Sequence, residues 1–312
     1  MQKKKMKEAT YIWKNGEFLN WREATTHVLS HTLHYGNSVF EGIRAYRTKE
    51  GLAIFRLQDH INRLLDSAKI VCITPRFSFK ELCDASVELI RKNRELLDSN
   101  NIYIRPLIYL GYGEMGVYHL NSPIEVIIAA WEWGEYLGNG AKENGIRVKT
   151  SSFTRNSIKS SFSKAKVGAN YLNFSMAKLE ALQCGFSEAI LLDSNGYVAE
   201  GSAECIFIIR NNTLITPPND NSLESITQNT VIKIAKDLGL DFIQRQITRD
   251  EIYISQEAFF VGTAAEITPI IELDGRIIRD GKRGEITKKI QDEFYKIVLG
   301  ENKNYSNYLT YI

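Results

Sequence analysis

A lysine inside a run of small residues is the side chain in this sequence best suited to covalent chemistry. Lys166 lies in the segment 165–171, which reads AKVGANY. Desolvation lowers the pKa of an amine, and a neutral amine can form a Schiff base with an aldehyde. The chain contains 39 Lys and Arg residues, however, and most of them are expected to be solvated surface charges. Lys166 on its own is therefore weak support for such chemistry.

Two other motifs suggest chemistry that their context argues against. Segment 111–116, GYGEMG, has the glycine spacing of a dinucleotide-binding loop. A strand is expected after it, so no helix N-terminus would be in place to hold a pyrophosphate. His27, His31 and His34 could bind a metal from one face of a helix, but the threonines around them favour a strand, which would point the rings to both faces. We therefore expect no metal site.

Composition argues against several classes of protein. The 312 residues carry a formal net charge of only +2, so no large positive field points to a nucleic-acid partner. No apolar run follows the basic residues 3–5 or approaches the length of a membrane span, so we expect neither a signal peptide nor a membrane segment. The four cysteines lack metal-ligand spacing and lie in apolar segments, as is typical of a reducing compartment: Cys72, Cys83, Cys184 and Cys205. A cytoplasmic globular protein is expected.

The elements that must position Lys166 mix strands and helices without a regular βαβ alternation, which predicts an α+β fold. In the first half, Asn15-Gly16 indicates a hairpin, and a helix is expected around the apolar residues at 61–68. Ser78 and Glu81 form a capping box that opens a second helix. The segments 102–110 and 124–130 read as buried strands, the second of them nearly continuous in apolar residues.

Glycines between 134 and 145 mark the expected boundary between two domains. We predict a smaller α+β domain over 1–134, an interdomain loop over 135–144 and a larger α+β domain over 145–312 that carries Lys166. In the larger domain, helices are expected at 170–184, at 227–238 with Thr227 as a candidate N-cap, and at 285–298. Strands are expected at 188–192 and 197–209.

Six separated segments together resemble the branched-chain amino acid aminotransferases, which belong to the fold type IV enzymes that use pyridoxal 5'-phosphate (PLP). The resemblance runs from about Trp13 to Gly300, and the segments keep their order and spacing. It implies the two-domain architecture of that fold type, with the cofactor site at the domain interface. The matching segments are 34–44 (HYGNSVFEGIR), 55–56 (FR), 103–106 (YIRP), the Lys166 segment, 200–201 (EG) and 262–269 (GTAAEITP).

The resemblance assigns the cofactor contacts residue by residue. Lys166 matches the Schiff-base lysine, Tyr171 the tyrosine that bonds the phenolic oxygen, and Glu200 the glutamate that faces the pyridine nitrogen. A carboxylate there keeps the nitrogen protonated, so that the ring can accept electrons from the substrate's α-carbon. The phosphate dianion needs cations or amide N–H groups. For this cradle the resemblance implies Arg56, Leu223, Ile226, Thr227 and Thr263.

The resemblance also implies how the substrate would be held. The amides of Ala264 and Ala265 would meet its α-carboxylate. Tyr35 and the 115–117 loop, which includes Val117, would reach the neighbouring subunit's site, so a homodimer is the minimal active unit expected. The substrate-binding residues implied, including an apolar pocket to which we assign Phe40, Trp133 and Tyr136, are Tyr35, Phe40, Tyr103, Arg105, Val117, Trp133, Tyr136, Ala264 and Ala265.

The sequence departs from the family's pattern in two places. Leu-Glu-Ser-Ile-Thr at 223–227 stands where the family usually has Leu-Pro-Gly-Ile-Thr. Ser225 restricts the close backbone approach to an anion that glycine allows, although its hydroxyl offers another donor, and Glu224 is expected to face solvent. Lys164 lies two residues before Lys166, so in an extended segment both would share one face. Spacing to Gly168 and Tyr171 favours Lys166.

The reaction that the resemblance implies is a ping-pong transamination. Leucine, isoleucine or valine would give its amino group to the cofactor and leave as the branched-chain 2-oxo acid, and 2-oxoglutarate would take that group and leave as glutamate. Lys166 would act as the general base and acid. Two alternatives remain open: a fold relative that acts on D-amino acids, amines or aminodeoxychorismate, and a homologue that binds PLP without turnover.

Overall fold

The computed structural model describes residues 7–134 and 136–312 and divides into two compact units, each considered by itself. The first unit comprises residues up to Gly134 together with Ala165–Ala169 and Ile297–Ile312. The second comprises residues 136–164 and Asn170–Lys296. Both contain a large sheet and several helices, which confirms the predicted α+β class.

An eight-stranded antiparallel sheet forms the frame of the first unit, with the order β17-β5-β4-β6-β7-β1-β2 and β3 paired to β6. Apolar residues on strands β6 and β7 make them its long central members, and they pair along their whole length. The bounds are β1 Tyr11–Lys14, β2 Glu17–Asn20, β3 Ser38–Phe40, β4 Ile43–Thr48, β5 Gly51–Phe55, β6 Asn101–Leu110, β7 Ile124–Glu132 and β17 Leu309–Tyr311.

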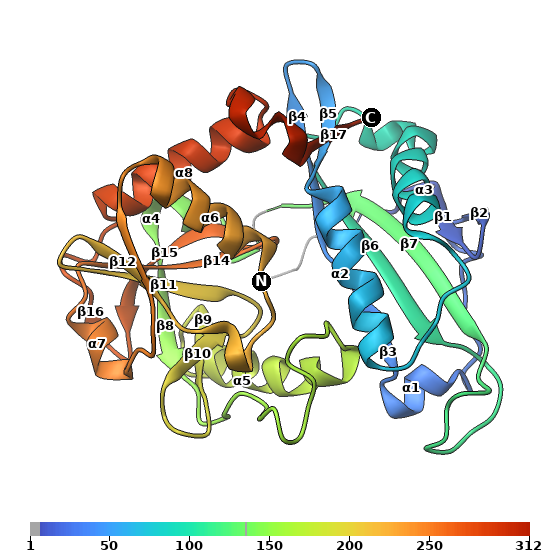
Figure 1. Cartoon of the computed structure of the whole chain (residues 1–312), viewed down its shortest axis with the longest axis horizontal. Coiled ribbons are helices and arrows are strands. Elements are labelled where there is room, and N and C mark those ends of the chain that lie inside the picture. The colour runs from blue at the N-terminus through green and yellow to red at the C-terminus, as the bar shows by residue number, and fades with distance from the viewer. Residues whose placement is uncertain (1–6, 135) are drawn as a thin grey trace. The chain divides into compact units, whose positions relative to one another are not determined.

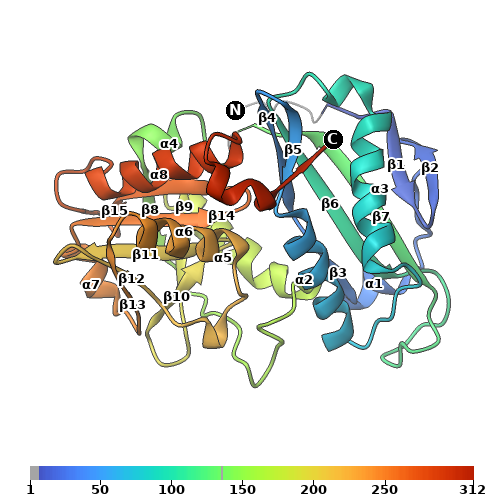
Figure 2. The same ribbon diagram turned by 45° about the horizontal axis from the view of Figure 1, so that its top comes forward.

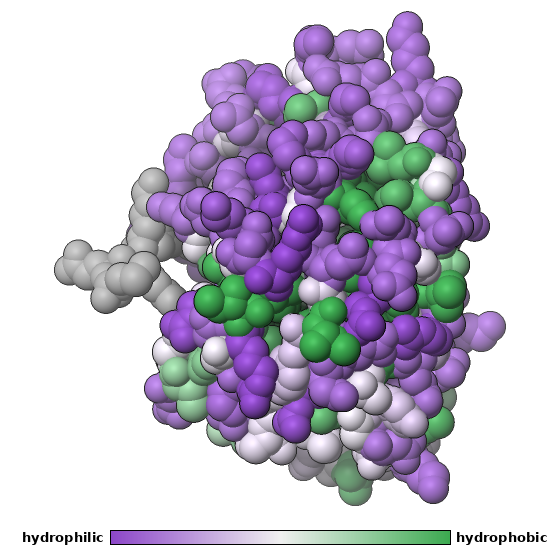
Figure 3. Space-filling view, turned by 90° about the vertical axis from the view of Figure 1, so that its left-hand side faces the viewer, coloured by the Kyte–Doolittle hydropathy of each residue, from purple (hydrophilic) through white to green (hydrophobic). Residues whose placement is uncertain are grey.

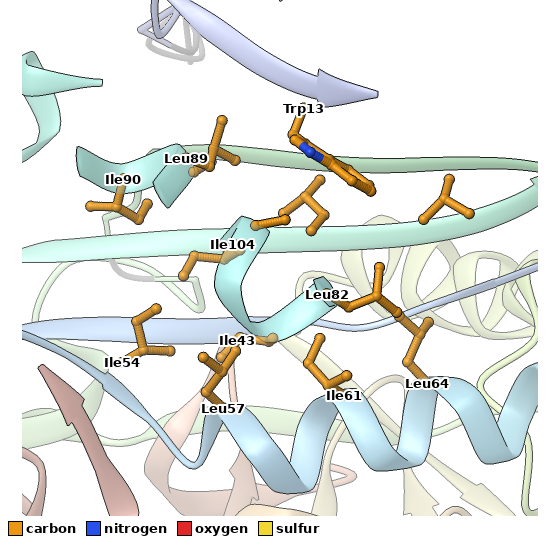
Figure 4. Close-up of a cluster of buried hydrophobic side chains, with 14 of the residues drawn as sticks. Trp13, Ile43, Ile54, Leu57, Ile61, Leu64, Leu82, Leu89, Ile90 and Ile104 are labelled. Carbon is orange, nitrogen blue, oxygen red and sulfur yellow. The ribbon is translucent and has the colours of Figure 1, made fainter. Parts of the chain in front are cut away.

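Two amphipathic helices, α2 (Leu57–Ile70) and α3 (Phe79–Lys92), cover one face of this sheet (Figures 1 and 2). Their apolar stripes recur with helical spacing and meet apolar side chains of the strands. Figure 4 shows the resulting core, in which Leu57, Ile61 and Leu64 of α2 lie near Ile43 and Ile54 of the sheet. The predicted capping box is confirmed, because the Ser78 hydroxyl and the Glu81 carboxylate each accept a hydrogen bond from the other residue's N–H. The short elements of this unit are α1 His31–Tyr35, η1 Arg94–Leu96 and η4 Lys303–Tyr308.

A nine-stranded mixed sheet forms the second unit, with the order β10-β9-β8-β15-β14-β11-β12-β13 and β16 paired to β15. Helix α5 packs on β9, and α6 packs on β13 and β14 (Figure 1). The strands are β8 Ile146–Thr150, β9 Glu188–Leu192, β10 Val198–Gly201, β11 Cys205–Arg210, β12 Thr213–Thr216, β13 Asp241–Gln244, β14 Glu257–Gly262, β15 Glu266–Leu273 and β16 Arg276–Ile277. The helices are α4 Ala141–Asn144, η2 Gly168–Asn170 at the boundary of the units, α5 Tyr171–Gln183, η3 Asn219–Asn221, α6 Ile226–Asp237, α7 Arg249–Tyr253 and α8 Glu285–Val298.

Figure 3 shows one face of the molecule, which is mainly polar. On the face seen in Figure 3, hydrophilic side chains predominate and hydrophobic ones form small, separate groups. Scattered exposed apolar residues of this kind are normal for a folded protein.

The structure differs from the sequence-based expectations at several boundaries. The stretch 135–144 contains the short helix α4 rather than only a loop, and Glu135 lies outside the described residues. The compact units also divide the chain differently from the expected 145–312 domain. The C-terminal segment belongs to the first unit because β17 pairs with β5, and the Lys166 segment does because Val167 bridges to Val39.

Two local predictions were wrong. The N-cap of α6 is Ser225 and not Thr227, since the Ser225 hydroxyl accepts a hydrogen bond from the Gln228 N–H at 3.1 Å. The expected strand at 197–209 is interrupted between β10 and β11, where the chain bends at 202–204.

Candidate active site

The backbone of Lys166 is held on both sides within the first unit. Its N–H donates to the Ser67 hydroxyl at 3.0 Å, and Ser67 is fully buried on α2. Its carbonyl accepts a hydrogen bond from the Phe40 N–H at 3.1 Å. The next residue, Val167, forms an antiparallel bridge with Val39. The lysine therefore extends from a segment fixed to both β3 and α2.

The small residues around Lys166 permit this close approach. A Cβ on Gly36 would lie 2.8 Å from the Ala169 Cβ, which is too close for a real contact, and Gly36 itself has a φ of 74°. A side chain on Gly168 would collide with the Ser38 hydroxyl. The half-buried Lys166 places its Nζ 5.1 Å from the centre of the Phe40 ring.

Lys164, the competing lysine, is engaged elsewhere. It is exposed in the second unit, and its Nζ donates to the Asn219 carbonyl at 2.5 Å. The same Nζ lies 3.3 Å from the Glu224 carboxylate, whose side chain is 73% exposed. The two departures from the family pattern thus meet in one surface ion pair, and Glu224 faces solvent as expected.

Arg56 is fixed at the junction of β5 and α2. Its φ of 51° is uncommon for a residue with a side chain, and its N–H donates to the Tyr308 carbonyl at 2.6 Å. The guanidinium lies 4.5 Å from the Tyr308 ring centre, and its Nε donates to Asp59 at 2.6 Å. A left-handed residue held in this way keeps the cationic side chain in one direction, with only 8% of it exposed.

Phe40, Tyr103 and Arg105 form one contiguous group in the first unit. The Arg105 Nη2 donates to the Tyr103 hydroxyl at 3.1 Å, and its guanidinium lies 4.6 Å from the Phe40 ring centre. Tyr103 stacks on Trp133 with ring centres 4.7 Å apart, and Gly42 leaves the space that the Tyr103 hydroxyl fills. Phe40 lies near the cationic groups of both Lys166 and Arg105, so the structure brings these predicted residues together.

Tyr35 and Val117 lie on a more exposed part of the first unit. Tyr35 is 40% exposed, with its ring 4.5 Å from the His31 ring, and Val117 is 90% exposed. The loop before Val117 is tied down by His31, whose Nε2 lies 2.7 Å from the Gly116 carbonyl. His31 and His34 lie on the short helix α1, so the strand expected there was wrong.

Glu200 is paired with a cation that the sequence reasoning missed. It lies on β10 and forms an ion pair with the Nε of Arg155, and both residues are more than nine-tenths buried in the second unit. The Arg155 guanidinium also lies 5.0 Å from the Phe174 ring centre. The expected burial of Glu200 indicates such a partner from the sequence, because a buried carboxylate is costly without a cation beside it.

The start of α6 offers backbone N–H groups to an anion. Ser225 caps the helix, Ile226 and Thr227 are its first residues, and both of these are buried while Leu223 is half-buried. The first N–H groups of a helix have no partner inside the helix and carry its positive dipole end.

At the start of α5, the half-buried Tyr171 packs edge-on against Phe174 with ring centres 5.2 Å apart.

Residues 263–265 form a tight connection between β14 and β15. Gly262 pairs with Glu266 across it, and Glu266 has a φ of 53°. The Thr268 hydroxyl donates to the Ala265 carbonyl at 2.8 Å, and the buried Glu266 carboxylate forms an ion pair with Lys142. These contacts fix the amides of Ala264 and Ala265. Tyr136 in the same unit is 37% exposed, with the Lys178 Nζ 5.6 Å from its ring centre.

Comparison with known proteins identifies the family. A family model described as amino-transferase class IV matches residues 38–273, which is most of the chain. The chain belongs to the class IV aminotransferases. The resemblance seen in the sequence is thereby confirmed.

Relatives and solved structures extend this family assignment over almost the whole chain. The branched-chain-amino-acid aminotransferase of Pseudomonas aeruginosa is 46% identical over 301 residues, covering 96% of this chain and 97% of the relative. The Escherichia coli enzyme of that name is 43% identical over 303 residues, covering 96% of each.

Two solved structures are similar to the whole fold. A crystal structure of the E. coli branched-chain amino acid aminotransferase has a TM-score of 0.93 at 42% identity, covering 97% of this chain and 99% of that one. The branched-chain amino acid aminotransferase of Thermobaculum terrenum, in its PLP-bound holo-form, has a TM-score of 0.89 at 34% identity, covering 97% of this chain and 98% of that one.

Proposed function

We propose that this chain is a PLP-dependent aminotransferase that exchanges the amino group of L-leucine, L-isoleucine or L-valine with 2-oxoglutarate, giving branched-chain 2-oxo acids and L-glutamate. Membership of the class IV aminotransferases and the near full-length similarity to branched-chain enzymes support it. The observation that carries the chemistry is the buried pair of Glu200 and Arg155, which supplies the ionised carboxylate that a protonated pyridine nitrogen requires.

The residues present fit PLP in their donor chemistry. Glu200, ion-paired with Arg155, suits the ring nitrogen, while the phenol of Tyr171 suits the phenolic oxygen. The N–H groups of Ile226 and Thr227 at the start of α6, with the hydroxyl of Thr263 and the guanidinium of Arg56, suit a phosphate dianion. Leu223 lies at the start of the segment that leads into this cradle. When bound, PLP supplies the aldehyde that takes the amino group and the ring that takes up the electrons of the α-carbon.

Lys166 is the proposed catalytic residue. Its Nζ would hold the cofactor covalently and, when free, would take the proton from the substrate's α-carbon as general base and return it as general acid. The hydrogen bond that the Lys166 N–H donates to Ser67 and the one that its carbonyl accepts from Phe40 fix the backbone, so only the side chain has to move between these tasks.

Substrate binding combines fixed amides with an aromatic and cationic group. The amides of Ala264 and Ala265 bind the α-carboxylate. Phe40 and Tyr136 supply apolar surface for the branched side chain, with Val117 and Trp133 as further contacts. Arg105, held by Tyr103 and assisted by Tyr35, supplies the polar groups that the second carboxylate of glutamate needs.

A homodimer is the proposed minimal active unit. Exposed apolar side chains gather on two neighbouring segments of the first unit, which are joined by the bridge between Ser30 and Tyr112. A surface of this kind marks an association site. Its members are Val28, Leu33, Tyr112, Met115, Val117, Tyr118 and Leu120.

We place the protein in the cytoplasm, in line with four cysteines that are all free thiols. Within residues 7–134 and 136–312, none of the helices combines the length and apolar character needed to cross a membrane. Small amino acids and 2-oxo acids are its proposed partners, and nucleic acid is not.

The half-reaction with L-leucine tests the proposal. Purified holoenzyme mixed with L-leucine, without any 2-oxo acid, should show the cofactor's absorbance shift from the aldehyde to the amine form. Adding 2-oxoglutarate should then restore the first spectrum. A shift with D-alanine or an amine but not with L-leucine would point to another substrate class, and no shift with any of them would point to a protein without turnover.

A further inference from the structure

Glu204 is a buried acid outside the set of residues assigned above. It lies in the bend between β10 and β11 and is 2% exposed. Its side-chain Oε2 accepts a hydrogen bond from the Ala203 N–H at 3.0 Å. The main-chain carbonyl of Glu204 accepts another from the Gly201 N–H at 2.6 Å. Its Oε1 is fully buried and has no hydrogen-bond partner among the residues that the structure describes. A buried polar atom without a partner calls for a physical explanation.

Lys178, the cation that acts on Glu204, is paired with another carboxylate, and the neighbouring Glu200 is paired with Arg155. Glu188 on β9 binds the Nζ of Lys178 from α5 at 2.5 Å, and Glu200 on β10 binds Arg155. Burial, reinforced by the charge of Glu188 and to a smaller extent by that of Glu200, raises the pKa of Glu204 to about 8, although Lys178 and the Ala203 N–H partly oppose the shift. At neutral pH this carboxyl is therefore mainly protonated.

Glu204 packs against two of the segments that carry proposed cofactor contacts in the second unit. A Cβ on Gly201, the residue after Glu200, would lie 2.8 Å from the Glu204 Oε2. A Cβ on Gly262, the residue before Thr263, would lie 3.6 Å from its Cγ. The carboxyl group thus fits directly against the backbone of Gly201, where a Cβ would collide with it, and the Glu204 side chain lies close to Gly262 through its Cγ.

We propose that Glu204 is a positioning residue which, as a neutral carboxylic acid, holds the Glu200 segment against the Thr263 segment. The inference rests on the proposed function, because it assigns these two segments to the cofactor. An ionised Glu204 would be a buried charge without a cation of its own, because Lys178 is bound to Glu188, and this is costly enough that the packing must open or admit water. Opening would displace Glu200, Thr263 or both, and PLP would bind less tightly.

Equilibrium titration of the apoenzyme with PLP between pH 7 and pH 9 tests this, with wild type, Glu204→Gln and a matched control compared at each pH. Glutamine has the shape of the protonated acid and cannot ionise, so its PLP Kd at pH 7 should stay within about threefold of wild type. Wild-type Kd should rise by about tenfold more than that of Glu204→Gln by pH 9, since only about a tenth of a group with this pKa is protonated there. Glu251→Gln, which removes a glutamate bound to Arg245 in the same unit, should follow wild type.

A second readout does not depend on the cofactor. The raised pKa means that the stability contributed by Glu204 is complete below its unfolded pKa of about 4.5 and is lost as the pH rises through about 8. The free energy of unfolding of the apoprotein should thus fall more between pH 5 and pH 8 in wild type than in Glu204→Gln. If the glutamine variant does not fold, Glu204→Leu, which is also uncharged, replaces it in both measurements.

The outcomes separate the two proposals. Equal pH dependence of wild type and the uncharged variants, in PLP affinity and in unfolding, would overturn the role of Glu204 alone. Wild-type protein that binds no PLP at any pH would overturn the proposed function and this inference with it. Failure of both uncharged variants to fold would also overturn the role of Glu204, because a site that holds a neutral acid should accept a neutral side chain of the same shape.

Discussion

At the scale of single residues, the two neighbouring lysines differ in what surrounds them. Lys166 extends from a backbone held by Ser67 and Phe40, whereas Lys164 is exposed and bound to the Asn219 carbonyl and to Glu224. Borohydride reduction of the holoenzyme followed by peptide mapping should therefore place the PLP adduct on Lys166. Lys166→Ala should lower kcat by at least about 10²–10⁴-fold, the range for loss of a general acid–base group, while Lys164→Ala stays within about threefold. An adduct on Lys164 would contradict the assignment.

The pair of Glu200 and Arg155 makes a second residue-scale prediction. Arg155→Leu leaves a buried carboxylate without its arginine, so the free energy of unfolding should fall by about 3–5 kcal/mol and PLP should bind more weakly. The double variant Arg155→Leu with Glu200→Leu removes both charges and should recover most of the stability in urea unfolding, but not the activity. Recovery of activity in the double variant would show that Glu200 has no role in the reaction.

The sequence pointed to the proposed site residues better than to the residues that hold them in place. Glu200 and Lys166 lie in short motifs with fixed spacing, so the resemblance could point to them. Arg155 and Ser67 support them from 45 and 99 positions away, and these partners follow from tertiary packing rather than from local pattern. The sequence likewise leaves two candidates for the lysine that binds the cofactor, and the contacts of Lys164 with Asn219 and Glu224 distinguish it from Lys166.

At the scale of elements, the N-terminus of α6 bears on the altered phosphate cradle. Ser225 supplies the N-cap that Thr227 was expected to supply, and Glu224 forms an exposed ion pair with Lys164, which contributes little. Glycine is nearly as good an N-cap as serine and allows closer approach to an anion. The variant Glu224→Pro with Ser225→Gly should therefore bind PLP at least as tightly as wild type in equilibrium titration. Ser225→Ala is the matched control and should cost about 1 kcal/mol of stability; clearly weaker PLP binding in the Pro-Gly variant would refute the prediction.

The Glu180 carboxylate of helix α5 binds β8 and the segment that follows it, which predicts a pH dependence. Burial alone would raise the pKa of Glu180, but hydrogen bonds from the Ser151 hydroxyl, the Ser152 N–H and Lys149 outweigh it and lower the pKa to about 2. The stability that Glu180 contributes is thus present above about pH 4.5 and is lost as the pH falls towards 2. Wild type should be more stable than Glu180→Gln at pH 6, and denaturant unfolding should show this difference shrinking between pH 4.5 and pH 3. A difference that grows on acidification would have the wrong sign.

At the scale of the whole molecule, local signals predicted elements but not their grouping. The hairpin at Asn15-Gly16 and the capping box of α3 involve neighbours in sequence, and both are confirmed. The pairing of β17 with β5 joins residues about 250 positions apart, and no local pattern marks it. The same holds for the short Lys166 segment, which joins the first unit through a single bridge and a few hydrogen bonds. Non-local pairings of this kind can be identified only from the three-dimensional structure.

Self-association is the last property to test at this scale. Val117 and Leu120 are 90% and 60% exposed in the apolar surface of the first unit, and a proposed homodimer would bury them. Wild type should sediment at twice the mass of one chain or more at micromolar concentration. Val117→Asp with Leu120→Asp should sediment as a single chain and lose activity, because charges are costly to bury without partners. Leu172→Asp, at a leucine that is 72% exposed on α5 of the second unit, should keep at least the dimer. A wild type that is monomeric and fully active would rule out the dimer as the active unit and remove any need for Val117 to reach a neighbouring site.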